Sequence, residues 1–168
     1  MKFERIHNKG QAQIFENKYL EMLTKGHPAV IWGMYIPLLS YCIYYGISRY
    51  DLSVLTVICL FFGAMLFWTL FEYFAHRYLF HWTAEQPSLK RIVYIFHGNH
   101  NHYPRDKQRL FMPPVPSILL ASIIFLIQYL ILGKYAFAFF PGFMIGYLLY
   151  ASIHYLIHAV APPFKFMK

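Results

Sequence analysis

Four apolar runs, each close to twenty residues long, constrain what this chain of 168 residues can fold into. They lie at approximately Ala29–Ile47, Leu52–Phe74, Val115–Leu132 and Tyr135–Ile157. About 20 consecutive apolar residues form a helix long enough to cross the hydrocarbon core of a bilayer. The sequence therefore predicts an all-α integral membrane protein with four spans, folded as a four-helix bundle.

The composition excludes several classes of soluble protein. Hydrophobic residues make up 58% of the chain and the mean hydropathy is +0.39, which is too apolar for an ordinary soluble domain. The net charge of +8 does not indicate nucleic-acid binding, because the basic residues are sorted by membrane side. Cys42 and Cys59 lie inside apolar runs, so they predict neither a disulfide framework nor a thiolate metal site.

The apolar runs pair into two helical hairpins, and the basic residues give these hairpins a direction. The connections at 48–51 and 133–134 are short, whereas a longer polar stretch at about 75–114 separates the hairpins. Of the fifteen Lys and Arg residues, only Arg49 and Lys134 lie in the two short connections. Because cytoplasmic loops are enriched in Lys and Arg, both termini and the central stretch are predicted to be cytoplasmic.

The sequence divides into an N-terminal segment, residues 1–28, and a membrane domain, residues 29–168. Residues 11–25 mix apolar and charged side chains, so an amphipathic helix on the membrane surface and a loosely ordered polar leader are both consistent with them. The first residues contain no apolar run of the kind found in secretory signals, so no cleavable signal peptide is expected.

Seven of the nine histidines form three clusters at the predicted cytoplasmic ends of the membrane helices. The clusters are His76 and His81, then His97, His100 and His102, and finally His154 and His158. Imidazole is the commonest metal-binding side chain, and no cysteine lies nearby, so the clusters predict a metal site built from nitrogen ligands. His7 and His27 lack such neighbours and are predicted to be surface residues.

The topology predicts that these clusters meet. His76 lies 24 residues after Leu52, and His158 lies 23 residues after Tyr135. At 1.5 Å per residue both lie roughly 35 Å along their helices, just beyond a hydrocarbon core of about 30 Å. Any one cluster is also consistent with interfacial polar decoration, a basic patch or a solvated loop. Convergence of all three at one height favours the metal site.

The motifs around these histidines resemble those of the fatty acid hydroxylase / sterol desaturase superfamily, and most closely those of fatty acid 2-hydroxylases. The family pattern E-Y-x-x-H-R-x-L-F-H is similar to residues 72–81, and H-G-x-H-H-x-x-P-x-D-x-x-R-L-x-x-P-P is similar to residues 97–114. The Y-x3-H-Y-x2-H pattern of the last helix is similar to Tyr150, His154, Tyr155 and His158. The resemblance runs from about residue 60 to the end of the chain.

The chain departs from the family pattern at two places. Asn101 stands where the family has the second histidine of the H-H pair, so either the carbonyl oxygen of Asn101 or the imidazole of His102 is expected to take that ligand position. The family also has an H-x2-H-H box shortly after the fourth helix, and the sequence ends at Lys168, where that segment begins. We therefore expect that the chain either is truncated or has lost chemistry that its relatives carry out.

The resemblance implies 2-hydroxylation of a fatty acid, free or within a sphingolipid, with O2, two electrons and two metal ions. Oxygen insertion into an unactivated C–H bond needs a redox metal, and zinc is redox-silent, so iron is the expected cofactor and zinc a substitute in an inactive form. The expected ligands are the seven clustered histidines and Asn101. The residues expected to hold or orient these ligands are Glu72, Asp106, Arg109 and Tyr155.

No segment resembles cytochrome b5, so the electrons are expected from a separate donor, either cytochrome b5-like or ferredoxin-like. The basic residues Lys90, Arg91, Arg105 and Lys107 fit docking of an acidic redox partner, and the positive-inside rule explains them equally well. Two alternatives stay open. One is a hydroxylase or desaturase of the same superfamily that acts on sterols or carotenoids. The other is an inactive membrane protein that binds one metal ion or none and holds lipid.

Overall fold

The computed structural model describes residues 25–80 and 110–159. Regular structure in these two ranges is entirely helical, which confirms the all-α prediction for this part of the chain. The long helices are α2 (Pro28–Tyr50), α3 (Val54–Phe74), α6 (Pro114–Leu132) and α7 (Ala136–Ala159). A π-helix, η1 (Ala75–Phe80), continues α3, and a 3-10 turn, η3 (Gly133–Tyr135), joins α6 to α7.

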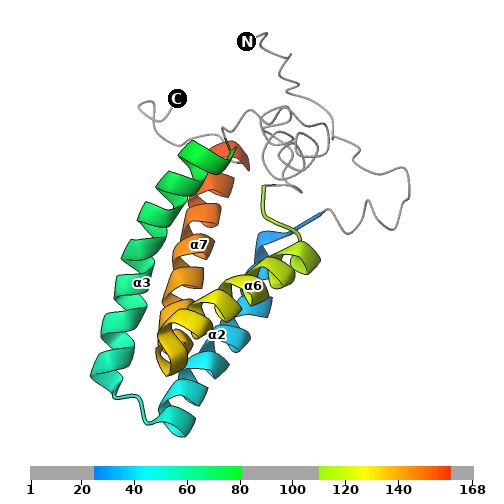
Figure 1. Ribbon diagram of the computed structural model, residues 1–168. Helices are drawn as coiled ribbons and strands as arrows, with labels where there is room; N and C mark the ends of the chain where they lie inside the picture. Colours follow the sequence, from blue (N-terminus) through cyan, green and yellow to red (C-terminus); the bar gives the residue numbers. More distant parts are fainter. Residues whose placement is uncertain (1–24, 81–109, 160–168) are drawn as a thin grey trace.

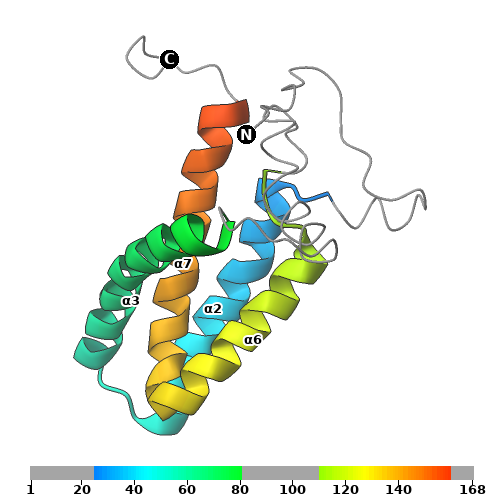
Figure 2. The same ribbon diagram turned by 45° about the horizontal axis from the view of Figure 1, so that its top comes forward.

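Among the described residues, three helical stretches are long and apolar enough to cross a membrane, namely Pro28–Tyr50, Val54–Phe74 and the 44 residues Pro114–Ile157. The third stretch contains α6, η3 and α7, and it turns back on itself at η3 so that α6 and α7 lie side by side (Figures 1 and 2). The outward faces of α3 and α6 expose large aliphatic side chains, as a lipid environment favours. Examples that are at least 70% exposed are Leu55, Leu66, Leu130 and Ile131.

Helix α7 lies at the centre of the molecule, and the other three long helices pack around it (Figure 2). Its inward side chains Phe143 and Leu148 are at most 2% exposed. They pack in one core with Ile31 and Tyr35 of α2 and with Phe111, which precedes α6. Both α2 and α7 continue through an internal proline, as membrane helices tolerate.

Close contact between α3 and α7 depends on two glycines of α7. Gly142 and Gly146 form the G-x3-G pattern through which membrane helices approach closely. A Cβ added at Gly142 would collide with the backbone carbonyl of Phe61, and one added at Gly146 would lie 2.7 Å from the Cβ of Trp68. The backbones of the two helices therefore touch at Phe61 and Gly142, and this contact fixes their relative position.

Hydroxyl and indole groups join α2 to its neighbours. The hydroxyls of Tyr35 and Ser117 are 2.7 Å apart and both side chains are buried. The Trp32 indole donates a 3.0 Å hydrogen bond to Ser152 of α7, whose hydroxyl donates in turn to the Leu148 carbonyl. Each bond satisfies a polar group that would otherwise face an apolar interior.

Both predicted hairpin connections are present and lie at the same end of the molecule, which we call the turn end (Figure 1). Asp51 ends α2 with a left-handed φ of 51°, and Ser53 caps the first turn of α3. Gly133, with φ of 56°, opens the turn between α6 and α7. The last turn of α7 and η1 lie at the opposite end, which we call the histidine end after His76, His154 and His158.

Candidate functional site

Three of the eight predicted metal ligands lie in described helices. His76 is in η1, and His154 and His158 are in the last turns of α7. Five predicted ligands lie outside the described residues, namely His81, His97, His100, Asn101 and His102. Asp106 and Arg109, predicted to support the ligands, also lie outside them. Among the side chains that the structure describes, which do not include those of His76 and His158, no three His, Cys, Asp or Glu residues are grouped so as to hold a metal ion. The complete metal site therefore stays a prediction.

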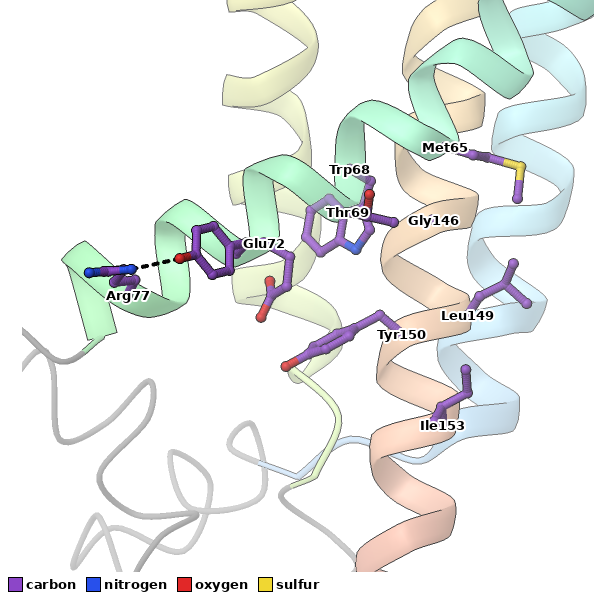
Figure 3. Close-up of a pocket in the computed structure, with 10 residues that line it drawn as sticks. Met65, Trp68, Thr69, Glu72, Arg77, Gly146, Leu149, Tyr150 and Ile153 are labelled. Carbon is purple, nitrogen blue, oxygen red and sulfur yellow. Dashed lines mark hydrogen bonds between the residues drawn. The ribbon is translucent and has the colours of Figure 1, made fainter.

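One helical turn before the histidines, side chains join α3 to α7. Glu72 precedes His76 by four residues, and Tyr150 precedes His154 by four. Glu72 reaches from α3 toward α7, where its carboxylate lies beside the Tyr150 hydroxyl (Figure 3). These two side chains therefore bridge α3 and α7 one turn before His76 and His154.

Tyr150 also contacts one of the predicted ligands directly. Its ring stacks on the His154 imidazole, with 5.9 Å between the ring centroids and 26° between the planes. The Tyr150 ring also lies near Trp68, with 6.5 Å between the ring centroids. Because Trp68 packs edge-on against Phe143 at 4.9 Å, the orientation of Tyr150 is fixed by the buried core.

The sequence analysis gave Tyr150 no role, although it is part of the family pattern. The available signal was the matching spacing of four residues from Glu72 to His76 and from Tyr150 to His154. If two such helix ends lie together, their preceding turns also face each other. A phenol on one helix can then donate a hydrogen bond to a carboxylate on the other.

The backbone changes from α-helix to π-helix immediately before His76. The Ala75 N–H bonds to the carbonyls of both Phe71 and Glu72, and the π-helix then runs to Phe80. π-helical turns are rare and occur frequently at functional sites. Nothing in the residue pattern signals this change.

Arg77 lies at the histidine end beside two tyrosines. Its Nη1 donates a 2.6 Å hydrogen bond to the Tyr73 hydroxyl. Its guanidinium carbon lies 6.0 Å from the Tyr73 ring centroid and 5.6 Å from that of Tyr78. These contacts hold an exposed cation near the edge of the predicted site.

A cavity of about 730 Å³ lies between α3 and α7, next to the Glu72–Tyr150 pair (Figure 3). Its volume is within the range of pockets that hold small molecules, roughly 300–1,000 Å³. Glu72, Tyr73 and Arg77, from the end of α3 and from η1, are among its polar lining residues, together with Thr69 and Tyr150. Met65, Leu149 and Ile153 are among the apolar residues that line the rest of the cavity.

Two further predicted residues have defined surroundings. Tyr155, expected to orient a ligand, packs edge-on against Phe111 with 5.9 Å between the centroids, and its expected role stays a prediction. His27, expected at the surface, is exposed, and its Nδ1 accepts a 3.2 Å hydrogen bond from the Ala29 N–H at the start of α2.

Residues 61–168 match the sequence profile of the fatty acid hydroxylase family. The ceramide very long chain fatty acid hydroxylase SCS7 of Saccharomyces cerevisiae is 34% identical over 165 residues, which cover 95% of this chain and 42% of that protein. The dihydroceramide fatty acyl 2-hydroxylase FAH2 of Arabidopsis thaliana is 31% identical, and the alignment covers 93% of this chain and 67% of that protein. The chain thus spans less than half of the yeast relative.

A solved structure also matches this fold. It is described as full-length scs7p with only the hydroxylase domain visible, and it superposes with a TM-score of 0.81 at 32% identity. The match covers 94% of this chain and 61% of that one. The similarity therefore extends beyond the region of the histidine motifs and includes α2.

Proposed function

The chain belongs to the fatty acid hydroxylase family, and from this premise we propose that it hydroxylates C2 of a fatty acyl chain, free or within a sphingolipid, with O2 and two electrons. The observation that carries the proposal is the chain of contacts from Glu72 through Tyr150 to His154. These contacts connect α3 with α7, the two helices that lead to the first and third histidine clusters. A separate cytochrome b5-like or ferredoxin-like protein supplies the electrons in this proposal.

The proposal includes a topology of four crossings. The chain is an integral membrane protein with three stretches able to span a bilayer, and the longest of them turns back at η3. One crossing by each of α2, α3, α6 and α7 puts Arg49 and Lys134 on one side. The positive-inside rule then supports placing the histidine end, with both termini, in the cytoplasm.

The donor chemistry of the histidine end fits a transition metal of intermediate softness such as iron. His76, His154 and His158 offer imidazoles, and the histidines of the central stretch would complete the set for two ions. Bound iron would supply the activation of O2 that insertion into a C–H bond requires. The residues of the chain perform the remaining tasks. Tyr150 orients the His154 ring, and Glu72 holds Tyr150 in place.

Substitution of the histidines on α7 tests the proposal. We expect His154→Ala and His158→Ala each to abolish formation of 2-hydroxy acyl lipids in cells that express the chain, as measured by lipid mass spectrometry. His7→Ala and His27→Ala are the matched controls and should retain activity, since His27 only caps α2. Full activity in either α7 variant would contradict the site assignment, and hydroxylated sterols in place of 2-hydroxy acyl lipids would contradict the substrate.

Metal analysis gives an independent test. The purified chain should contain about two iron ions per molecule, and His154→Ala should lower this content. A chain that holds a single zinc ion, or none, and yields no hydroxylated lipid would support the inactive alternative.

A further inference from the structure

The cavity between α3 and α7 arises because the two helices touch at one level and separate toward the histidine end. They are in backbone contact where Gly142 meets the Phe61 carbonyl. Farther along, the Trp68 side chain lies against Gly146, and beyond it α3 leads away from α7 (Figure 3). The cavity occupies this widening, so the Phe61–Gly142 contact closes it on the side of the turn end.

The α3 side of the cavity lining changes from apolar to polar along its length. Met65 and Trp68 lie toward the turn end, and Glu72 and Arg77 lie toward the histidine end. On the α7 side, Leu149 and Ile153 add aliphatic surface, and Ile153 lies at the level of the histidine end. The ligand that suits such a lining has a long apolar part and one polar end, and the cation at the mouth favours a carboxylate or carbonyl oxygen at that end.

The dimensions suit one acyl chain. The lining residues of α3 and η1 run from Met65 to Arg77, a rise of roughly 18 Å at α-helical spacing. One leaflet contributes about half of a hydrocarbon core of about 30 Å. Leu149 and Ile153 are 42% and 60% exposed on the outer surface of α7, so the cavity opens sideways toward lipid and not only toward the cytoplasm.

We propose that this cavity holds the acyl chain of the lipid substrate, with its carbonyl end at Glu72 and Arg77 and its tail toward Met65. The inference rests on the proposed function, because it assigns a place to that substrate. It puts the first carbons of the chain one helical turn from His154, beside the Tyr150 ring that stacks on this histidine. The chain enters laterally from the bilayer between α3 and α7.

Photochemical labelling tests this placement without requiring turnover. The full chain is reconstituted in phosphatidylcholine vesicles with a ceramide, or in parallel a free fatty acid, that carries a diazirine in the middle of its acyl chain. We expect labelling to concentrate at Met65 and Leu149 and to be weaker at Ile153, which lies at the level of the polar end of the lipid. An excess of the same lipid without the diazirine should reduce that labelling about tenfold.

Filling the cavity provides the matched variants. Leu149→Trp and Ile153→Trp place an indole in the cavity from exposed positions, so the core is left intact. Each should reduce the competed labelling and the formation of 2-hydroxy product about tenfold. The controls Leu66→Trp and Leu119→Trp introduce the same bulk at positions 70% and 65% exposed on α3 and α6, away from the cavity, and should change neither quantity.

The outcomes separate this inference from the proposed function. Competed labelling in the cavity without 2-hydroxy product would support the acyl-chain site and contradict the hydroxylase proposal. Product formation that is insensitive to both cavity-filling variants, or labelling that is spread over all lipid-facing positions and not competed, would overturn the inference. Uncompeted labelling would mean that the cavity holds ordinary bilayer phospholipid.

Discussion

Tyr150 links three groups whose positions matter for the predicted chemistry. Its hydroxyl lies beside Glu72, its ring stacks on His154, and Trp68 packs beside it. Tyr150→Phe keeps the ring and removes only the hydroxyl next to the Glu72 carboxylate. We expect the rate of 2-hydroxy lipid formation to fall about tenfold, as measured in membranes at equal expression.

The control for this variant is Tyr44→Phe, which removes a phenol hydroxyl from a side chain that is 65% exposed on α2. Its activity should equal that of the unmodified chain. Iron content should be measured on both variants, because Tyr150→Phe is expected to loosen the orientation of a ligand. Unchanged rate and iron content in Tyr150→Phe would show that the contact is only structural.

A second residue-scale prediction concerns the buried hydroxyl pair of Tyr35 and Ser117. Interhelical hydrogen bonds in membrane proteins contribute on average about 0.6 kcal/mol and at most about 1.7 kcal/mol. A double-mutant cycle with Tyr35→Phe and Ser117→Ala, measured by unfolding in mixed micelles, should give a coupling energy in this range. A coupling energy of zero would mean that the 2.7 Å contact does not stabilise the fold.

At this scale the sequence pointed to individual residues but not to their partners. Glu72 and His154 were both identified from the sequence, but the pairing of Glu72 with Tyr150 was not. Helix α3 is apolar on nearly all sides, so its residue pattern does not indicate which face turns toward α7. That face is set by close packing at Gly142 and Gly146, and a pattern of apolar residues does not encode such contacts.

At the scale of helices, the contact between α3 and α7 is the most sensitive to added volume. Gly142→Ala puts a methyl group where the Phe61 carbonyl lies, and overpacking of this kind typically costs about 1–3 kcal/mol. We expect lower stability in mixed micelles together with lower hydroxylase activity, because separation of α3 from α7 also parts Glu72 from Tyr150.

Gly63→Ala is the matched control on α3. A Cβ at Gly63 has no other atom within 4 Å, and alanine is the better helix former by about 1 kcal/mol. This variant should be at least as stable as the unmodified chain. If Gly142→Ala were equally well tolerated, the close approach of the two helices would not be essential.

The sequence predicted the four long helices to within about three residues at each end, because apolar runs bounded by polar residues determine where a membrane helix begins and ends. The short turns at Asp51 and Gly133 also agree with prediction. The π-helix at Ala75–Phe80 was not predicted. Its hydrogen-bond pattern depends on the surroundings of the helix end and has no signature in residue spacing.

At the scale of the whole molecule, the four proposed crossings place the turn end and the histidine end on opposite membrane faces. Single cysteines introduced in a background with Cys42→Ala and Cys59→Ala test this arrangement. The positions are Arg49→Cys and Lys134→Cys at the turn end, and Lys25→Cys and Arg77→Cys at the histidine end.

In sealed vesicles, a membrane-impermeant maleimide should modify one pair of cysteines and leave the other until detergent is added. The decisive observation is whether Arg49→Cys and Lys134→Cys react with the maleimide from the same side of the membrane. If these two positions were accessible from opposite sides, the segment Pro114–Ile157 would not cross the bilayer twice.

The contact at Phe61 and Gly142 has a mechanical consequence. Eleven residues separate Phe61 from Glu72, so the Glu72 carboxylate lies roughly 16 Å from this contact along α3. A rotation of α3 by a few degrees about this contact would move the Glu72 end by about an ångström. The Val54 end, roughly 10 Å from the contact, would move by about two thirds as much in the opposite direction. The contact between Glu72 and Tyr150 would resist such a rotation. If a lipid enters between α3 and α7 as proposed, its admission and the closure of the predicted site would then be a single movement.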